Sequence, residues 1–304
     1  MREIMAMSTD ILQKYQQAGK IAAEVREEAK RIVHENMLII DLCEKTESLI
    51  RSMGGKPAFP CNVSINEIAA HYTSPPHDKR IIPENSIVKV DIGVHIEGYI
   101  ADTAVTVSFN PEYKILVQAA EQALRKAIEI LRPGLLTSQF GSSIQKTIER
   151  LGLKPISNLT GHKIERYSLH AGKSLPNVFH VSTARVEIGE VYGVEPFVTF
   201  ADADGKVDGS SETHIFRFLK QKSLKTSHSK KLLECIKKDF QALPFSERWL
   251  QGCVEPVHYR EAFSELCSSK SLMSYPVFVE TSGKPVAQAE HTVLIVKDGC
   301  LVLS

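Results

Sequence analysis

Residues 90–105, VDIGVHIEGYIADTAV, are strand-like on both sides of Glu97-Gly98 and carry one aspartate on each arm. A two-residue turn at Glu97-Gly98 would make an antiparallel hairpin in which Asp91 faces Ala104. Side chains alternate along a strand, so Asp102 then shares a face with Asp91, at a diagonal spacing of about 7 Å. The stretch therefore predicts a hairpin that directs two carboxylates at one volume.

Two interpretations of this aspartate pair are open from the hairpin alone. The aspartates could be solvated side chains on an edge hairpin, because Glu-Gly is a weaker turn signal than Asn-Gly. Alternatively they could be buried, where two anions so close would raise each other's pKa unless a cation lay between them. Carboxylate oxygens are hard ligands that suit divalent metals.

The composition is that of an ordinary globular protein, with 304 residues, 43% hydrophobic and 24% charged residues and a formal net charge of +1. This length predicts one large domain, or one domain with a smaller appendage. The balanced charge gives no indication of a basic surface for nucleic acid. MREIMAMSTD has no signal-peptide core and no window reaches about 18 apolar residues, so we expect a cytoplasmic protein. The six cysteines form no CxxC pair, and we expect them to be reduced and mostly buried.

Helix and strand signals alternate along the chain. Periodicity and capping residues predict helices from Thr9, as the cap, to about Val33, from about Ile40 to Met53, from Asn110-Pro111 to about Leu131, and from Thr137 or Ser138 to near Gly152. Strands are predicted at PISNL (155–159), VYGVEPFVTF (191–200), PVFVE (276–280), AEHTVLIV (289–296) and CLVLS (300–304). Two helices thus precede strands twice, which suggests a duplicated unit.

The segment 204–274 differs from its surroundings because it is polar, rich in lysine and serine, and helical in pattern. We expect it to be an inserted helical subdomain, with residues 1–203 and 275–304 forming the main domain. The alternative is a long helical excursion of that same domain. Its run KQKSLKTSHSKK (220–231) is either a solvated face or a contact for nucleic acid or the ribosome.

Further candidate ligands lie in other motifs. GHKIERYSLHAG places His162 and His170 beside glycines, and Glu195 in VEPF and Glu290 in AQAEHT lie in apolar strands. Singly, a histidine is usually hydrogen-bonded core and a strand glutamate usually faces water. Together with the hairpin aspartates they would supply four carboxylates and a histidine, which suits two divalent ions with a bridging hydroxide. The absence of thiolate argues against a structural zinc site.

Five motifs along the chain resemble those of a known family. FPCNVSINEIAAHYT (59–73), the hairpin, NLTGHKIERYSLHAG (158–172), VEPF and AQAEHT, in that order, resemble the motifs of the type II methionine aminopeptidases. An insertion between the last two motifs is typical of type II, and the short N-terminus resembles the archaeal kind. The resemblance implies an α+β pita-bread fold, with pseudo-symmetric halves around a curved antiparallel sheet.

The resemblance also implies an active site. The ligands of two divalent ions (Co, Mn, Fe or Zn) would be Asp91, Asp102, His162, Glu195 and Glu290, with Asp102 and Glu290 bridging. Glu195 would act as general base and then general acid. His71 would hold the scissile amide and His170 would stabilise the carbonyl oxygen. The implied enzyme removes the initiator methionine from nascent proteins whose second residue is small.

The methionine side chain would occupy an apolar pocket. The resemblance assigns Phe59, Phe197, Tyr275 and the ring of His170 to it, with Leu169 and Phe278 as further candidates, although any one aromatic could be ordinary core. Because Arg2 follows Met1 in this chain, we expect Met1 to be retained. Two departures from the family pattern are Ala289, where phenylalanine is common, and VHENM (33–37), which replaces a Pro-Gly-type turn.

Two other classes of protein remain as alternatives. An aminopeptidase P or prolidase would share fold and metal ligands but usually carries a further N-terminal domain. A non-catalytic relative acting as a binding module would be expected to have lost ligands, and here each ligand position is filled. The expected partner is the N-terminal peptide of nascent proteins, with a ribosome contact left open, no membrane, no specific nucleic acid, and a monomeric state.

Overall fold

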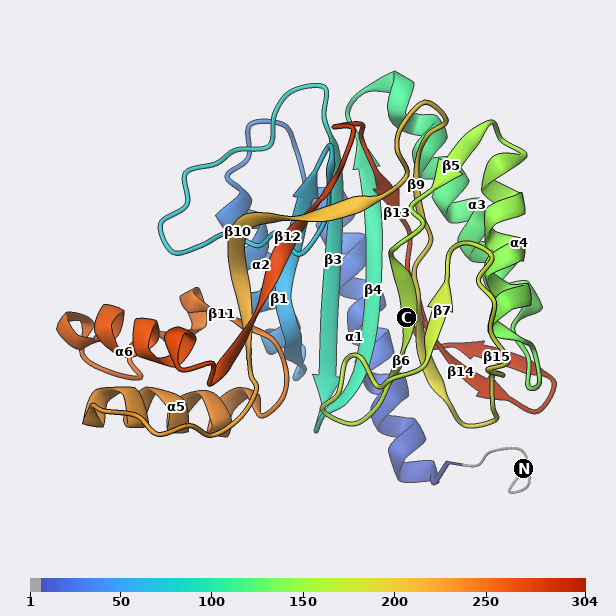
Figure 1. Ribbon diagram of the computed structural model, residues 1–304. Helices are drawn as coiled ribbons and strands as arrows, with labels where there is room; N and C mark the ends of the chain where they lie inside the picture. The colour runs from blue at the N-terminus through green and yellow to red at the C-terminus, as the bar shows by residue number, and fades with distance from the viewer. Residues whose placement is uncertain (1–6) are drawn as a thin grey trace.

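The computed structural model describes residues 7–304, in which helices cover one side of curved antiparallel strands (Figure 1). In the first half, α1 (Thr9–Ile32) and α2 (Ile39–Ser52) precede β1 (Lys56–Ile65), β2 (Ile68–Ala70), β3 (Ile87–Ile96) and β4 (Tyr99–Ser108). The sheet order is β1-β3-β4, and both helices pack on it. Both predicted helices are confirmed, although Ser8 rather than Thr9 caps α1, by accepting from the Ile11 amide at 3.4 Å.

The segment that links these two helices contains one of the departures from the family pattern. Asn36, in VHENM, has a φ of 66°, a left-handed conformation that asparagine tolerates better than most residues. Its amide donates to the Ile82 carbonyl at 2.8 Å. The departure thus lies in the turn between α1 and α2.

The second half repeats the order of helices before strands. A short 3-10 turn, η1 (Pro111–Tyr113), leads into α3 (Lys114–Ile130) and α4 (Thr137–Glu149). These helices pack against strands of two small sheets, β13-β9-β5 and β15-β14-β8-β6-β7. The strand bounds are β5 Leu153–Pro155, β6 Thr160–Ile164, β7 Ser174–Pro176, β8 Val191–Val194, β9 Phe197–Phe200, β13 Ala287–Gln288, β14 His291–Val296 and β15 Gly299–Val302.

The predicted strands of this half are confirmed in position with two differences. PISNL is mostly irregular, because β5 ends at Pro155. VYGVEPFVTF is split at Glu195-Pro196 into β8 and β9, since proline has no amide hydrogen to continue the ladder. The split leaves Glu195 at a break between strands.

The hairpin of β3 and β4 has the predicted register. Ile96 pairs with Tyr99 and Asp91 with Ala104. Both turn residues have positive φ, 49° for Glu97 and 89° for Gly98, as a tight two-residue hairpin turn requires. Asp102 is 3% exposed, which excludes the interpretation of two solvated aspartates.

The two halves meet where β4 reaches the C-terminal strands. Ala104 pairs with Glu290 as an isolated bridge, and the Thr103 hydroxyl donates to the Glu290 carbonyl at 2.8 Å. Each half has its own buried apolar cluster between helices and strands. The bridge therefore joins two separately packed layers at the position of a candidate ligand.

The segment 204–274 is helical only in part. It contains α5 (Ser227–Phe240) and α6 (Pro256–Ser268), with β11 (Phe245–Ser246) and η2 (Glu247–Leu250) between them. It opens, however, with a long strand, β10 (Val207–Phe218), that pairs with β12 (Leu272–Glu280), and the sheet order is β11-β10-β12-β2. The segment that was expected to be helical in pattern therefore also contains strands, because β12 supplies the hydrogen-bond partners of β10.

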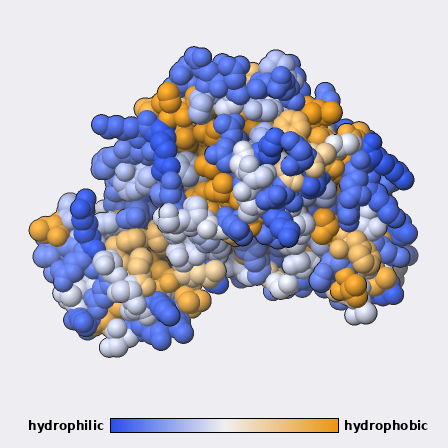
Figure 2. Space-filling view, turned by 45° about the horizontal axis from the view of Figure 1, so that its top comes forward, coloured by the Kyte–Doolittle hydropathy of each residue, from blue (hydrophilic) through white to orange (hydrophobic). Residues whose placement is uncertain are grey.

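The part of the insertion that carries α5 and α6 projects to one side of the molecule (Figure 1). It has its own buried cluster, which includes Leu232, Phe245 and Leu266. Figure 2 shows a mostly hydrophilic surface with small apolar patches on the face in view. The division into 1–203 with 275–304 and 204–274 stays a prediction.

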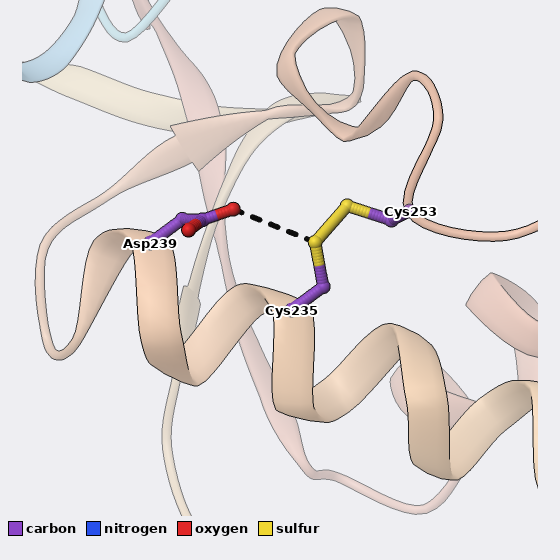
Figure 3. Close-up of a disulfide and its surroundings, with 3 residues drawn as sticks. All are labelled: Cys235, Asp239 and Cys253. Carbon is purple, nitrogen blue, oxygen red and sulfur yellow. Dashed lines mark hydrogen bonds between the residues drawn. A yellow bond between two sulfur atoms is a disulfide. The ribbon is translucent and has the colours of Figure 1, made fainter.

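Cys235 on α5 and Cys253 before α6 form a disulfide, beside the Asp239 carboxylate (Figure 3). Cys43 and Cys61 are buried thiols, whereas Cys267 is exposed. The expectation of reduced and mostly buried cysteines is therefore wrong for the insertion, where folding brings together two cysteines that lie 18 residues apart. Within residues 7–304, no helix combines the length and apolar character needed to cross a bilayer.

Candidate metal centre

The predicted metal ligands line one cavity of about 200 Å³. They come from both halves of the fold: Asp91 from β3, Asp102 from β4, His162 from β6, Glu195 from the break between β8 and β9, and Glu290 from the residue before β14. The Nε2 atom of His162 lies 3.6 Å from Asp102 Oδ2 and 3.5 Å from Glu195 Oε1. One donor atom each from Asp102, His162 and Glu290 lie within 4.8 Å of one another.

Several of these carboxylate oxygens are buried without a hydrogen-bond partner among residues 7–304. They are Asp91 Oδ1, Asp102 Oδ1 and Glu290 Oε1. Glu290 is 1% exposed, so its carboxylate is shielded from bulk solvent. Orphaned carboxylate oxygens are costly in a protein interior unless a cation binds them. The donor set of carboxylates and one imidazole therefore fits divalent metal ions.

The charges of the cluster oppose one another when no cation is present. Burial raises the pKa of Asp91 to about 7, against hydrogen bonds that lower it. Burial, followed by repulsion from neighbouring carboxylates, raises the pKa of Asp102 and Glu290 well above the ordinary values. Burial lowers the pKa of His162, so its imidazole is neutral and has a lone pair to donate.

Two residues that the sequence analysis did not select support the cluster. Gln288 Nε2 donates to Glu290 Oε2 at 3.2 Å and lies 3.5 Å from Glu195 Oε2. Asn62 on β1 pairs with Asp91 across the sheet and lines the cavity. A signal for Gln288 was available, since it lies two residues before Glu290 in AQAEHT. No comparable signal marked Asn62, because its role depends on strand pairing.

All the predicted substrate-contacting residues line the same cavity. They are Phe59, His71, Leu169, His170, Phe197, Tyr275 and Phe278. The ring of Phe59 packs closely on Gly93, since a Cβ added to Gly93 would lie 2.2 Å from that ring. The ring of His170 lies 4.3 Å from that of His162, centroid to centroid. The cavity therefore has a carboxylate end and an aromatic wall.

His71 has an unusual backbone and a defined tautomer. Its φ is 66°, a left-handed conformation that is rare for residues other than glycine and asparagine. Its Nδ1 lies 3.3 Å from the Pro276 carbonyl oxygen, which can only accept, so Nδ1 carries the hydrogen. Burial, with a smaller effect of His170, lowers the pKa of His71 to about 4. The neutral ring thus presents Nε2 as an acceptor.

His170 and Ala289 occupy different environments. His170 is solvent-exposed as a whole residue, yet its ring lies inside the cavity, and burial there with the nearby charge of Arg217 lowers its pKa. Ala289 belongs to the buried apolar cluster of the second half rather than to the cavity wall. The departure at Ala289 therefore concerns packing rather than the lining of the cavity.

Comparison with known proteins gives a family by sequence and a matching fold among solved structures. The model of metallopeptidase family M24 matches residues 13–296. The chain is 41% identical to the methionine aminopeptidase of Methanothermobacter thermautotrophicus, over 97% of this chain and 99% of that protein. Among solved structures, a thermophilic Arx1 has a TM-score of 0.84 at 20% identity, covering 98% of this chain and 91% of that one. A methionine aminopeptidase from Thermotoga maritima has a TM-score of 0.70 at 21% identity, covering 99% and 98%.

The fold and the buried carboxylate cluster are those of a metal-dependent hydrolase, and the predicted pita-bread fold is confirmed. The chain belongs to metallopeptidase family M24, together with the archaeal methionine aminopeptidases. It is an aminopeptidase. The resemblance that the sequence motifs indicated is confirmed as well.

Proposed function

We propose that the protein removes the N-terminal methionine from newly made chains whose second residue is small, using two divalent metal ions. The observation that carries this proposal is the buried cluster of four carboxylates around His162, several of whose oxygens lack partners, at the end of a cavity walled by aromatic rings. Activity against N-terminal methionine is also the activity named for its archaeal relatives.

In this proposal Asp91, Asp102, His162, Glu195 and Glu290 together would hold the two ions. The short distances from His162 Nε2 to Asp102 and to Glu195 support this grouping. When bound, the ions would supply a water that ionises near neutral pH and a Lewis acid for the substrate. The donor set is compatible with Co, Mn, Fe and Zn alike.

The protein's own residues would handle the protons and the peptide. Glu195 takes the proton of the attacking water and delivers it to the leaving amine, while Gln288 orients its carboxylate. His71 accepts the N–H of the scissile amide at Nε2, because its Nδ1 hydrogen is held by Pro276. His170 donates to the carbonyl oxygen as negative charge develops there.

Selectivity for methionine would come from the aromatic end of the cavity. Phe59 and Phe197 are buried, and with Tyr275 they offer an apolar slot for an unbranched side chain. The rings of His71 and Phe278 lie 4.7 Å apart, centroid to centroid, on the wall beside the proposed position of the scissile amide. The second residue of the substrate would pass along this wall.

The test is release of methionine from peptides beginning Met-Ala and Met-Lys, with and without added divalent metal. We expect metal-dependent release from the Met-Ala peptide and little from the Met-Lys peptide. Equal cleavage of both peptides, or no cleavage by folded protein after metal reconstitution, would contradict the proposed function.

The ligand assignment has a separate test in bound metal. We expect His162→Ala and Glu290→Gln to lose metal, measured by elemental analysis, and to lose activity while the circular dichroism spectrum is retained. Glu165→Gln is the matched control, because Glu165 follows the same strand as His162 but is exposed. Wild-type turnover in either ligand variant would rule out the proposed site.

The proposed setting is the cytoplasm, with the enzyme acting as a monomer on chains emerging from the ribosome. The lysines of residues 220–231 are exposed and support a contact with an acidic surface such as the ribosome. The proposed main domain is 1–203 with 275–304, and 204–274 is the proposed insertion. Retention of Met1 before Arg2 concerns positions outside the described residues, and the intact mass of the protein tests it.

A further inference from the structure

A second cavity of about 400 Å³ adjoins the candidate metal centre. The two cavities share a wall that includes His71, His170 and Tyr275. Of these, His71 and His170 would flank the scissile bond, and Tyr275 would border the methionine slot. A peptide whose methionine fills the first cavity therefore has the second cavity as a path for its following residues.

Arg217 extends from β10 into this second cavity. Ile215, two residues earlier on the same face of the strand, lines the first cavity, and Arg217 lines the second. The strand pairing places Ile215 opposite Tyr275 and Arg217 opposite Met273. The face of the β10–β12 ribbon thus runs from the methionine slot to the second cavity, with Arg217 at its outer part.

The guanidinium of Arg217 is half-buried, yet no carboxylate among residues 7–304 forms a salt bridge with it. By contrast, Arg248 pairs with Glu47 and Arg80 with Glu212. Among the described residues, Arg217 is also the only lysine or arginine that lines either cavity. A partly buried cation without a carboxylate partner is unfavourable, and a bound carboxylate would relieve it.

The charge of Arg217 reaches the shared wall. Burial raises the pKa of Tyr275, and the neighbouring Arg217 opposes that rise. The positive charge of Arg217 therefore acts on Tyr275, which borders both cavities.

We propose that Arg217 is a specificity-determining residue that selects peptides with an acidic side chain at the third or fourth position and disfavours lysine or arginine there. The inference rests on the proposed function and adds a preference beyond the first two residues of the substrate. An extended peptide advances about 3.3 Å per residue, so the residues that follow the scissile bond would extend along the second cavity. A carboxylate there would form a charge-assisted hydrogen bond with the guanidinium.

The test compares kcat/KM for Met-Ala-Asp-Asp, Met-Ala-Lys-Lys and Met-Ala-Ala-Ala peptides with blocked C-termini. For the wild-type protein at low salt we expect the acidic peptide to exceed the basic one about tenfold, mainly through KM, because the contact is made in binding. The ratio should shrink at high salt, since salt screens a half-exposed pair. An acidic-to-basic ratio near one at low salt would overturn the proposal.

Variants separate the role of Arg217 from the charge of the whole protein. We expect Arg217→Gln to bring the acidic-to-basic ratio close to one and Arg217→Glu to invert it. Lys220→Gln makes the same change in net charge as Arg217→Gln, but at an exposed position outside both cavities. It should keep the wild-type ratio. An unchanged ratio in both Arg217 variants would overturn the inference. Absence of release even from Met-Ala-Ala-Ala would instead refute the proposed function.

Discussion

Gly193 lies directly behind two of the candidate ligands. It is on β8, where it pairs with His162 on one side and Thr292 on the other. A Cβ at this position would lie 2.8 Å from Glu290 Oε1 and 3.3 Å from His162 Cε1. The absence of a side chain at Gly193 is therefore what lets the two ligands approach each other.

We expect Gly193→Ala to weaken metal binding by about tenfold or more, because both ligands must shift by several tenths of an ångström. Direct titration of metal into metal-free protein measures this change. Gly299→Ala on β15 is the matched control, since the nearest atom to its added Cβ lies 3.8 Å away. Equal metal affinity in the two variants would contradict the role assigned to Gly193.

His95 is a second residue whose surroundings have a measurable consequence. Burial, with a smaller effect of Lys56, lowers the pKa of His95 to about 4, and its Nδ1 accepts the Gly98 amide at 3.0 Å. The unfolded chain therefore binds a proton near pH 6.5 that the folded chain does not bind until about pH 4. The contribution of neutral His95 to the free energy of unfolding is fully present above pH 6.5 and is lost as the pH falls towards 4.

We expect His95 to contribute a loss of about 2 kcal/mol in the free energy of unfolding between pH 7 and pH 5, given about 1.4 kcal/mol per pKa unit. His95→Asn keeps an acceptor near Nδ1 but cannot titrate. Urea unfolding of metal-free wild-type and variant protein at both pH values measures the difference. Parallel pH dependence in the two proteins would show that His95 is not responsible.

At the scale of elements, the β3–β4 hairpin determines whether its two aspartates face one volume. The register depends on the two-residue turn, because a loop with one more residue would move one aspartate to the other face. Gly98 has a φ of 89°, and a Cβ there would lie 2.4 Å from the Tyr167 ring. Gly98 is therefore required both by the backbone and by packing.

Replacing Gly98 with alanine should cost about 2 to 3 kcal/mol of unfolding free energy, from backbone strain and the contact with Tyr167. Gly134→Ala should cost about 1 kcal/mol, because Gly134 has a similar φ of 83° but open space around it. The two variants, compared by urea unfolding, separate strain from clash. Equal losses would mean that the Tyr167 contact carries no energy.

The elements also differ in how readily they are predicted from sequence. The β3–β4 hairpin was predictable because apolar alternation and turn residues are local signals. The strand β10 was not, since its first half, with Asp208, Ser211 and Glu212, is exposed and carries no apolar alternation. Its conformation comes from hydrogen bonds to β12, which lies more than fifty residues further along the chain.

At the scale of the whole molecule, a buried ion pair fastens the insertion to the first half. Arg248 on η2 donates to Glu47 on α2 at 3.0 and 2.8 Å, and its Nε donates to the Ser74 carbonyl at 2.7 Å. The neighbouring Trp249 indole also donates to Glu47, at 2.7 Å. Glu47 is 2% and Arg248 8% exposed, so the pair is largely shielded from water.

We expect Arg248→Met to destabilise the protein by about 3 to 5 kcal/mol, because it leaves the Glu47 carboxylate buried without its cation. The double variant Glu47→Gln with Arg248→Met should recover part of this loss, since the uncompensated charge is then absent. A double-mutant cycle by urea unfolding measures the coupling. Additive losses from the two single changes would show that the pair is not coupled.

The sequence by itself determined the helices, the hairpin register, the residue types suited to a metal site and, through its ordered motifs, the family. These follow from local preferences and from patterns along the chain. Only the tertiary structure decided that residues from five separate segments share one cavity, because the pairing of Ala104 with Glu290 and of His162 with Gly193 joins distant segments. The tertiary structure also decided the disulfide of the insertion and the position of Arg217 beside the second cavity. Local sequence patterns predict neither the partner of a cysteine nor the cavity that a strand side chain will line.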